Sequence, residues 1–142
     1  MAHEMTRDET RAFLLDGTRT GKLAIVRADG RPHVTPTWFT LDGDDVVLTT
    51  HETSMKAKGI RRDPRVAMCV DDQAPPYSYV LVEGTAALSD DLDELRRVAT
   101  AVGGRYMSAD RADEFGARNA VPGELAVRIT PTNIIARADI AD

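Results

Sequence analysis

The chain has 142 residues, 42% of them hydrophobic and 29% charged, with a formal net charge of −5. This length predicts one domain covering residues 1–142, and the composition is typical of a soluble globular protein. No apolar run approaches the roughly 18 to 20 residues of a membrane-spanning helix, and the polar start of the chain lacks the apolar core of a signal peptide. We therefore expect a cytoplasmic protein with no membrane partner. The single cysteine, Cys69, excludes an internal disulfide and a cysteine-cluster metal site.

The first half of the chain predicts a helix, three strands and a second helix. A capping box at Thr6–Glu9 begins the first helix, which ends at Gly17. The three expected strands cover residues 22–27, 33–40 and 45–50. Asp29-Gly30 predicts a hairpin between the first two, and the prolines of the second predict an edge strand or a broken one. The second helix begins near Ser54 and ends before Asp63-Pro64, which disfavours its continuation.

The second half predicts two further strands, a helical region and two C-terminal strands. The expected strands cover residues 65–70, 77–88, 125–130 and 134–138, and the expected helices cover residues 92–102 and 109–117. Gly84 indicates a bulge in the longest strand, and Gly103-Gly104 is expected to end the first of these helices. The order of elements favours a mainly β, α+β fold, an antiparallel barrel of six to seven strands with helices on its rim.

The charge is distributed unevenly along the chain. Between Lys56 and Arg65 there are five cations and one anion, a net charge of +4, so the other 132 residues carry −9. A basic island on an acidic protein suggests a site for a small anion rather than for nucleic acid. A solvated helix face is the alternative that charge alone leaves open.

The residues around this island have the chemistry of a phosphate site. One strand ends in Thr49-Thr50, and Ser54 begins a helix whose first N–H groups are free and whose dipole is positive at that end. These donors, together with Lys56 and Lys58, can bind a phosphate without a glycine-rich loop.

Several standard catalytic patterns are absent from the sequence. There is neither a Walker loop nor a dinucleotide fingerprint, and His3, His33 and His51 lack metal-ligand spacing, so no metal is expected. Ser54 has no nearby histidine to activate it, and Cys69 lies in an apolar strand. Nucleophilic catalysis therefore has no specific support.

Three segments and the strand order resemble the split-barrel flavin and deazaflavin oxidoreductases, the family related to pyridoxamine-phosphate oxidase. The segments are Asp29–Phe39, Lys56–Val66 and Tyr77–Ala86. The second, with a lysine, a small helix and then Arg62-Asp63-Pro64-Arg65, is the most specific. The likeness covers the chain from about Thr6 to Ile140 and is closest to the B group that uses the deazaflavin coenzyme F420. It implies a split β-barrel that forms a homodimer with two cofactor sites at its interface.

The resemblance also implies a set of cofactor-binding residues. They are Pro36, Thr37, Trp38, Thr49, Thr50, Ser54, Met55, Lys56, Lys58, Arg61, Tyr77 and Tyr79. The first three would lie along the ring system, and the lysines and hydroxyl groups would bind the cofactor phosphate. The two tyrosines would reach in from the partner subunit, Tyr79 being a candidate proton donor. Arg61 would meet the polyglutamate tail of F420 or face water.

This resemblance predicts an F420-dependent oxidoreductase that transfers a hydride to a small electron-poor molecule such as an enone or a quinone. Two alternatives stay open: an FMN-dependent enzyme on the same fold, and a cofactor- or tetrapyrrole-binding protein without catalysis. The chain departs from the family at two places. Asn133–Ala136 replaces the arginine-histidine motif of true pyridoxamine-phosphate oxidases, which argues against pyridoxamine oxidation, and Gly59 replaces a common asparagine, which predicts a looser helix. We expect strand edges and residues 103–119 to line the substrate pocket.

Overall fold

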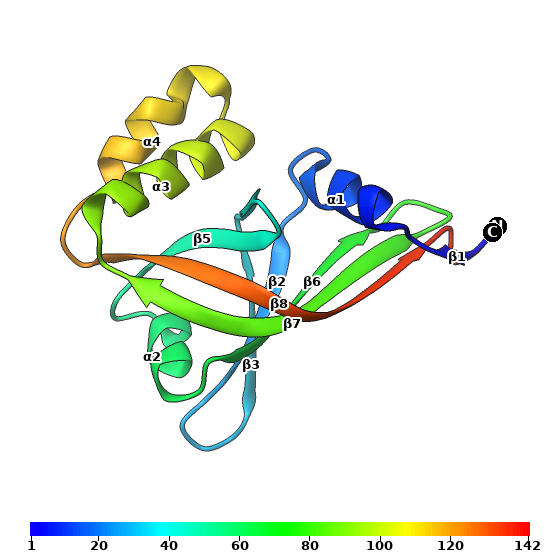
Figure 1. The fold of residues 1–142 in the computed structure, drawn as a ribbon, viewed down its shortest axis with the longest axis horizontal. Coiled ribbons are helices and arrows are strands. Elements are labelled where there is room, and N and C mark those ends of the chain that lie inside the picture. The colour runs from blue at the N-terminus through cyan, green and yellow to red at the C-terminus, as the bar shows by residue number, and fades with distance from the viewer.

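The computed structural model describes residues 1–142 as one antiparallel sheet with helices around it (Figure 1). The helices are α1 (Arg7–Leu15), α2 (Met55–Arg62), α3 (Leu92–Tyr106) and α4 (Ala112–Asn119), and a 3₁₀ turn, η1 (Ala109–Arg111), precedes α4. The strands are β1 (His3–Glu4), β2 (Gly21–Val26), β3 (Pro32–Thr37), β4 (Thr40–Asp42), β5 (Asp45–His51), β6 (Arg65–Asp72), β7 (Ser78–Ser89) and β8 (Glu124–Ala138).

The sheet is curled but not closed. Its strand order is β3-β2-β6-β7-β8-β5-β4, with the two-residue β1 paired to β8 outside this order. The two edge strands, β3 and β4, are separated in the sequence only by Trp38 and Phe39. The edges therefore approach each other without forming a ladder, which confirms the expected split barrel. The edge position of β3 also confirms the prediction from its prolines, since proline cannot donate a ladder hydrogen bond.

The two longest strands, β7 and β8, form a twisted ribbon across the molecule (Figure 1). Glu83 pairs with Asn133, but the next residue, Gly84, pairs with Pro131, so Thr132 has no partner. This is a β-bulge, and a Cβ atom on Gly84 would collide with the carbonyl oxygen of Thr130. The bulge predicted at Gly84 is therefore present, but its extra residue belongs to β8.

Two apolar clusters lie on opposite sides of β5. Sixteen buried residues fill the barrel, including Phe39, Leu48 and Val127, with Leu14 from α1 and Ile60 from α2 closing its ends. A smaller cluster packs α3 onto the outer face of the barrel through Val47, Leu95, Val98, Val102 and Ala126. Helix α4 folds back beside α3, so the two helices form a pair that stands against one side of the sheet (Figure 1).

Two sequence expectations about element boundaries were wrong. Gly103-Gly104 does not end α3, which continues to Tyr106, because Gly103 is where Phe115 of α4 packs against the helix. The two expected C-terminal strands are one continuous strand, β8, in which Pro131 lies beside the bulge. The looser α2 expected from Gly59 is not found: Gly59 is buried, and a Cβ atom there would lie 2.5 Å from Ile25 Cδ1, so glycine lets α2 pack closely on β2.

None of the helices combines the length and the apolar character needed to cross a membrane.

Candidate functional site

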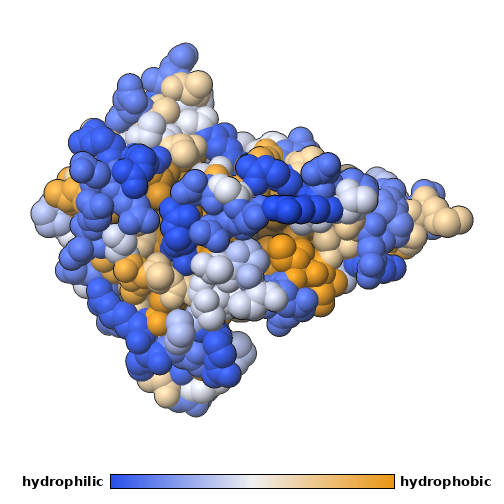
Figure 2. All heavy atoms as spheres, in the orientation of Figure 1, coloured by the Kyte–Doolittle hydropathy of each residue, from blue (hydrophilic) through white to orange (hydrophobic).

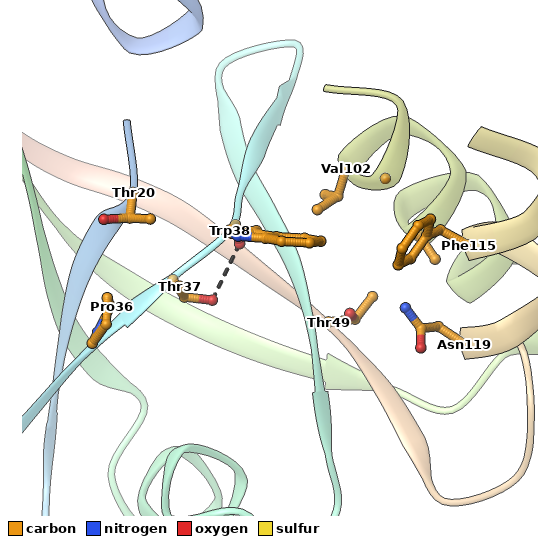
Figure 3. A pocket seen from close by; sticks show the side chains of 10 residues that line it. Thr20, Pro36, Thr37, Trp38, Thr49, Val102, Phe115 and Asn119 are labelled. Carbon is orange, nitrogen blue, oxygen red and sulfur yellow. Dashed lines mark hydrogen bonds between the residues drawn. The ribbon is translucent and has the colours of Figure 1, made fainter. Parts of the chain in front are cut away.

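A cavity of about 370 Å³ lies between the sheet and the α3–α4 pair (Figure 3). Its lining residues are Thr20, Pro36, Thr37, Trp38 and Thr49 from the sheet and its connections, and Ala99, Val102, Gly103, Phe115 and Asn119 from the two helices. The indole of Trp38 projects into it between Val102 and Thr49, toward Phe115 (Figure 3). The cavity thus combines aromatic walls with hydroxyl and amide groups, and three residues of the segment 103–119 contribute to its lining.

Trp38 belongs to a cluster of three aromatic rings. Its ring is parallel to that of Tyr106 within 1°, with the ring centroids 5.1 Å apart. Phe115 meets it at 63° with a centroid distance of 6.1 Å. Both arrangements are favourable for aromatic pairs.

The end of α3 holds this cluster through hydrogen bonds to backbone groups. The Tyr106 hydroxyl donates to the Arg19 carbonyl at 2.8 Å and accepts from the Phe39 N–H at 3.3 Å. Arg105 donates to the carbonyl oxygens of Leu14, Gly17 and Phe39. Burial raises the pKa of Tyr106, so its hydroxyl stays protonated near neutral pH. The end of α3 therefore ties α1, the α1–β2 connection and the β3–β4 connection into one rigid wall.

The head of α2, which is its N-terminal turn together with Ser54 and Thr50, has its own set of hydrogen-bond donors. Ser54 caps the helix by accepting from the Ala57 N–H at 3.1 Å, and its hydroxyl lies 2.8 Å from that of Thr50. Whichever of the two hydroxyls donates in this pair, the other keeps a free proton. The first N–H groups of a helix also lack acceptors within the helix. This corner can therefore donate several hydrogen bonds to an anion.

Four cations on α2 have no carboxylate partner within 4.0 Å: Lys56, Lys58, Arg61 and Arg62. No ion pair involves any of them, whereas the fifth cation of the basic island, Arg65, is paired with Asp63 at 2.6 Å. That pairing lowers the pKa of Asp63 to about 2. The excess positive charge expected from the sequence therefore lies on α2 itself.

Lys56 is the cation among these that is partly buried. It lies in the first turn of α2, and burial lowers the pKa of its ammonium group. A partly buried ammonium without a counter-ion is costly, and an anionic ligand would remove that cost. The donors present therefore fit a phosphate-bearing cofactor.

The cavity and the head of α2 meet at one open strand edge. Thr49 lines the cavity, and Thr50 bonds to Ser54. Strand β4 pairs with β5 only as far as Val47, so the edge of β5 beyond that residue is not covered by β4. A ligand can cross this edge between the two sides of β5.

The structure brings together most of the expected site residues within one chain, but in two groups. Four of them line the cavity, namely Pro36, Thr37, Trp38 and Thr49. Six lie at or on α2, namely Thr50, Ser54, Met55, Lys56, Lys58 and Arg61.

The two expected tyrosines are not part of this arrangement in a single chain. Tyr79 pairs with Arg137 at one end of β7, whereas the Ala86 N–H, toward the other end, donates to the carbonyl of Pro64, two residues after α2. Seven residue-to-residue steps of strand separate them, roughly 23 Å at the usual rise. Tyr77 lies still farther along, just before β7. Within one chain these tyrosines therefore do not reach the head of α2.

Sequence reasoning missed the roles of Tyr106, Phe115 and Asn119. They lie in a region without a motif. Phe115 and Asn119 reach the cavity because α4 folds back on α3, whereas Tyr106, at the end of α3, stacks on Trp38. The glycines of these helices were the available signal that α3 and α4 pack closely. A Cβ atom on Gly103 would collide with Phe115, and one on Gly116 with Thr100. No three His, Cys, Asp or Glu side chains are grouped so as to hold a metal ion.

A sequence model of the pyridoxamine 5'-phosphate oxidase family matches residues 6–138 of the chain. The chain belongs to this family. A relative from Mycobacterium tuberculosis, an F420H(2)-dependent biliverdin reductase, is 25% identical over all of this chain and 97% of its own length.

Two solved structures extend the comparison. A conserved hypothetical protein from Mycobacterium tuberculosis has a TM-score of 0.83 and 29% identity, covering 93% of this chain and 84% of its own. A structure described as an F420 reductase has a TM-score of 0.63 and 27% identity, covering 87% of this chain and 94% of its own. This family member is thus similar along nearly its whole length to proteins named for F420 chemistry.

Proposed function

We propose that this family member is an F420-dependent oxidoreductase that reduces a small electron-poor molecule such as an enone or a quinone. One observation carries the proposal. At the open edge of β5, the aromatic cavity meets the cations of α2 that have no carboxylate partner. The whole-length likeness to an F420H(2)-dependent reductase supports F420 as the cofactor.

The residues have separate tasks in this proposal. Lys56 and Lys58 bind the phosphate, together with the free proton of the Thr50–Ser54 pair and the first N–H groups of α2. Met55 and Arg61 lie on the same helix and extend this contact along the cofactor chain. Pro36, Thr37 and Trp38 position the ring system, and Thr49 faces it from β5.

Reduced F420 supplies a hydride to one carbon of an electron-poor double bond, and a proton from solvent completes the two-electron reduction. The protein needs no nucleophile for this reaction. Its task is to hold the acceptor and to limit water. The hydroxyl of Tyr106 does not serve as the proton source, because its proton is held by the Arg19 carbonyl.

We also propose a homodimer in which Tyr77 and Tyr79 reach the site of the partner subunit. Two observations support it: the distance that separates Tyr79 from α2 within one chain, and the exposed isoleucines Ile134 (45%) and Ile135 (41%) on β8. Figure 2 shows an apolar patch on the β7–β8 ribbon, where a second subunit could pack. A monomer by sedimentation equilibrium at the concentration used for activity measurements would contradict this assembly.

The function is tested with the purified protein, F420 and FMN. We expect F420 to bind, and reduced F420 to be oxidised when menadione or an enone is added. Tight binding of FMN, released as a yellow cofactor on denaturation, would favour the FMN-dependent alternative. Failure both to bind F420 and to oxidise its reduced form with enone or quinone acceptors would refute the proposal.

A further inference from the structure

The two faces of the Trp38 indole have different surroundings. Tyr106 covers one face as a parallel ring. Trp38 is nevertheless 38% exposed and lines the cavity into which its indole projects (Figure 3), and we take the face that Tyr106 does not cover to be the one a ligand meets. A flat ring that is backed by a second ring and open on one side is a stacking platform.

The orientation of this platform is set by Tyr106 rather than by Trp38 itself. No hydrogen bond involves the indole N–H, and the short connection that carries Trp38 lies outside β3 and β4. Tyr106, in contrast, is held by hydrogen bonds at both sides of its hydroxyl, to Arg19 and from Phe39. Its ring is therefore the fixed surface against which the indole rests.

Phe115, on the helix side of the cavity, limits the space beside the indole further. Phe115 stands at 63° to the indole and is only 6% exposed, and it packs against Gly103 so closely that no Cβ atom fits there. The space beside the free indole face is thus bounded by rigid groups, while Thr49 and Asn119 offer polar atoms at its lining.

We propose that Tyr106 is a specificity-determining positioning residue, which fixes the plane of Trp38 so that the cavity selects flat, conjugated electron acceptors over non-planar ones. This inference rests on the proposed function, because it takes the cavity to hold the acceptor beside the cofactor ring that Pro36, Thr37 and Trp38 position. A flat acceptor with a carbonyl group, such as a naphthoquinone, gains the whole indole face, whereas a puckered ring contacts only part of it.

The test compares two acceptors in the full-length protein without F420. Menadione is the flat probe, carvone is the non-planar probe, and calorimetry gives the Kd of each. Trp38 is the only tryptophan, so quenching of its fluorescence reports binding at this cavity. We expect Tyr106→Leu to raise the Kd of menadione about 5- to 10-fold, the range of an aromatic stacking contribution, with the Kd of carvone changed less than about twofold.

Two matched variants separate positioning from folding. Tyr106→Phe keeps the ring and loses only the two hydrogen bonds of the hydroxyl, so it should raise the menadione Kd less than Tyr106→Leu does, and Met107→Leu changes the exposed next residue and should have no effect. In turnover with reduced F420, Tyr106→Leu should raise the KM of menadione and leave kcat nearly unchanged. An unchanged menadione Kd in Tyr106→Leu, or an equal loss for menadione and carvone, would overturn the proposal.

If Tyr106→Leu does not fold, a second pair of variants decides. Trp38→Phe keeps a flat ring and Trp38→Leu removes it, so only the second should lose menadione affinity by about tenfold. Equal menadione binding by the two would overturn the proposal. Because menadione binding is measured without F420, an absence of F420 binding would refute the proposed function separately.

Discussion

Thr49 and Thr50 are consecutive residues of β5 that serve opposite sides of the sheet. Thr49 lines the cavity beside α3, whereas Thr50 is buried and lies 2.8 Å from Ser54 at the head of α2. Neighbouring side chains of a strand alternate between its faces, so this one dipeptide links the two halves of the site. A cofactor that uses both must cross the edge of β5, and its affinity should depend on residues from each side.

Replacing Lys56 with alanine should weaken the binding of F420, or of FMN if that is the cofactor, by about 10- to 100-fold, the range expected for a lost charge-assisted hydrogen bond. The matched control is Arg65→Ala, which removes a cation of the same basic island that is already paired with Asp63. Calorimetric titration of the two variants and the unmodified protein checks this. Equal losses in both variants would show that only the general positive charge of the region matters.

Cofactor binding should weaken as the pH rises into the alkaline range. Burial lowers the pKa of Lys56, and only its protonated form attracts a phosphate, so affinity falls as the pH passes through this pKa. Lys56→Arg should extend tight binding to higher pH, because a guanidinium stays protonated. Affinities measured from pH 7 to 10.5 for both proteins give the comparison. The same alkaline decrease in both would assign it to another group.

Gly103→Ala should destabilise the protein by about 1 to 3 kcal/mol, the usual cost of overpacking, because the added methyl group collides with Phe115. Gly104→Ala is the neighbouring control: its methyl group would meet only the Ala112 Cβ, at 3.2 Å, and alanine favours the helix by about 1 kcal/mol. Urea unfolding measures both effects. A Gly103→Ala protein as stable as Gly104→Ala would mean that α3 and α4 are not packed this closely.

Asp63→Asn should lower the stability at neutral pH, and this difference should shrink in acid. Hydrogen bonds from Arg65 lower the pKa of Asp63 from 3.8 to about 2, so the carboxylate contributes stability above pH 3.8 that is lost as the pH falls toward 2. Urea midpoints of the variant and the unmodified protein from pH 7 to 2 test this. Asp90→Asn, at an exposed position without an ion pair, should not show the same convergence.

The parts of the molecule that depend on local signals were predictable. The β2–β3 hairpin follows from Asp29-Gly30, and the start of α2 follows from Ser54, which caps it as expected. The basic island was visible as a cluster of charges. What the sequence could not show is that Arg65 is neutralised by Asp63 while Lys56 has no partner, since this depends on side-chain geometry.

The cavity was harder to predict because its walls come from distant parts of the chain. Trp38 and Tyr106 are 68 residues apart, yet their rings are stacked. Continuation of α3 through Gly103-Gly104 opposes helix propensity by about 1 kcal/mol per glycine, and the packing of Phe115 against Gly103 outweighs it. Tertiary contacts therefore decide where α3 ends, and with it the position of Tyr106.

The bulge at Thr132 makes β8 one strand by its hydrogen bonds but two by the direction of its side chains. Before the bulge, odd-numbered residues such as Val127 and Ile129 are buried in the barrel, and after it the even-numbered Ala136 and Ala138 are buried. Without the bulge, an unbroken alternation of the same residues would turn Ile135 and Arg137 inward and the two alanines outward, whereas deleting Thr132 would keep the alanines inward. A single unpaired residue thus sets which face every later side chain of the strand presents, including the pair of isoleucines left open to a second chain.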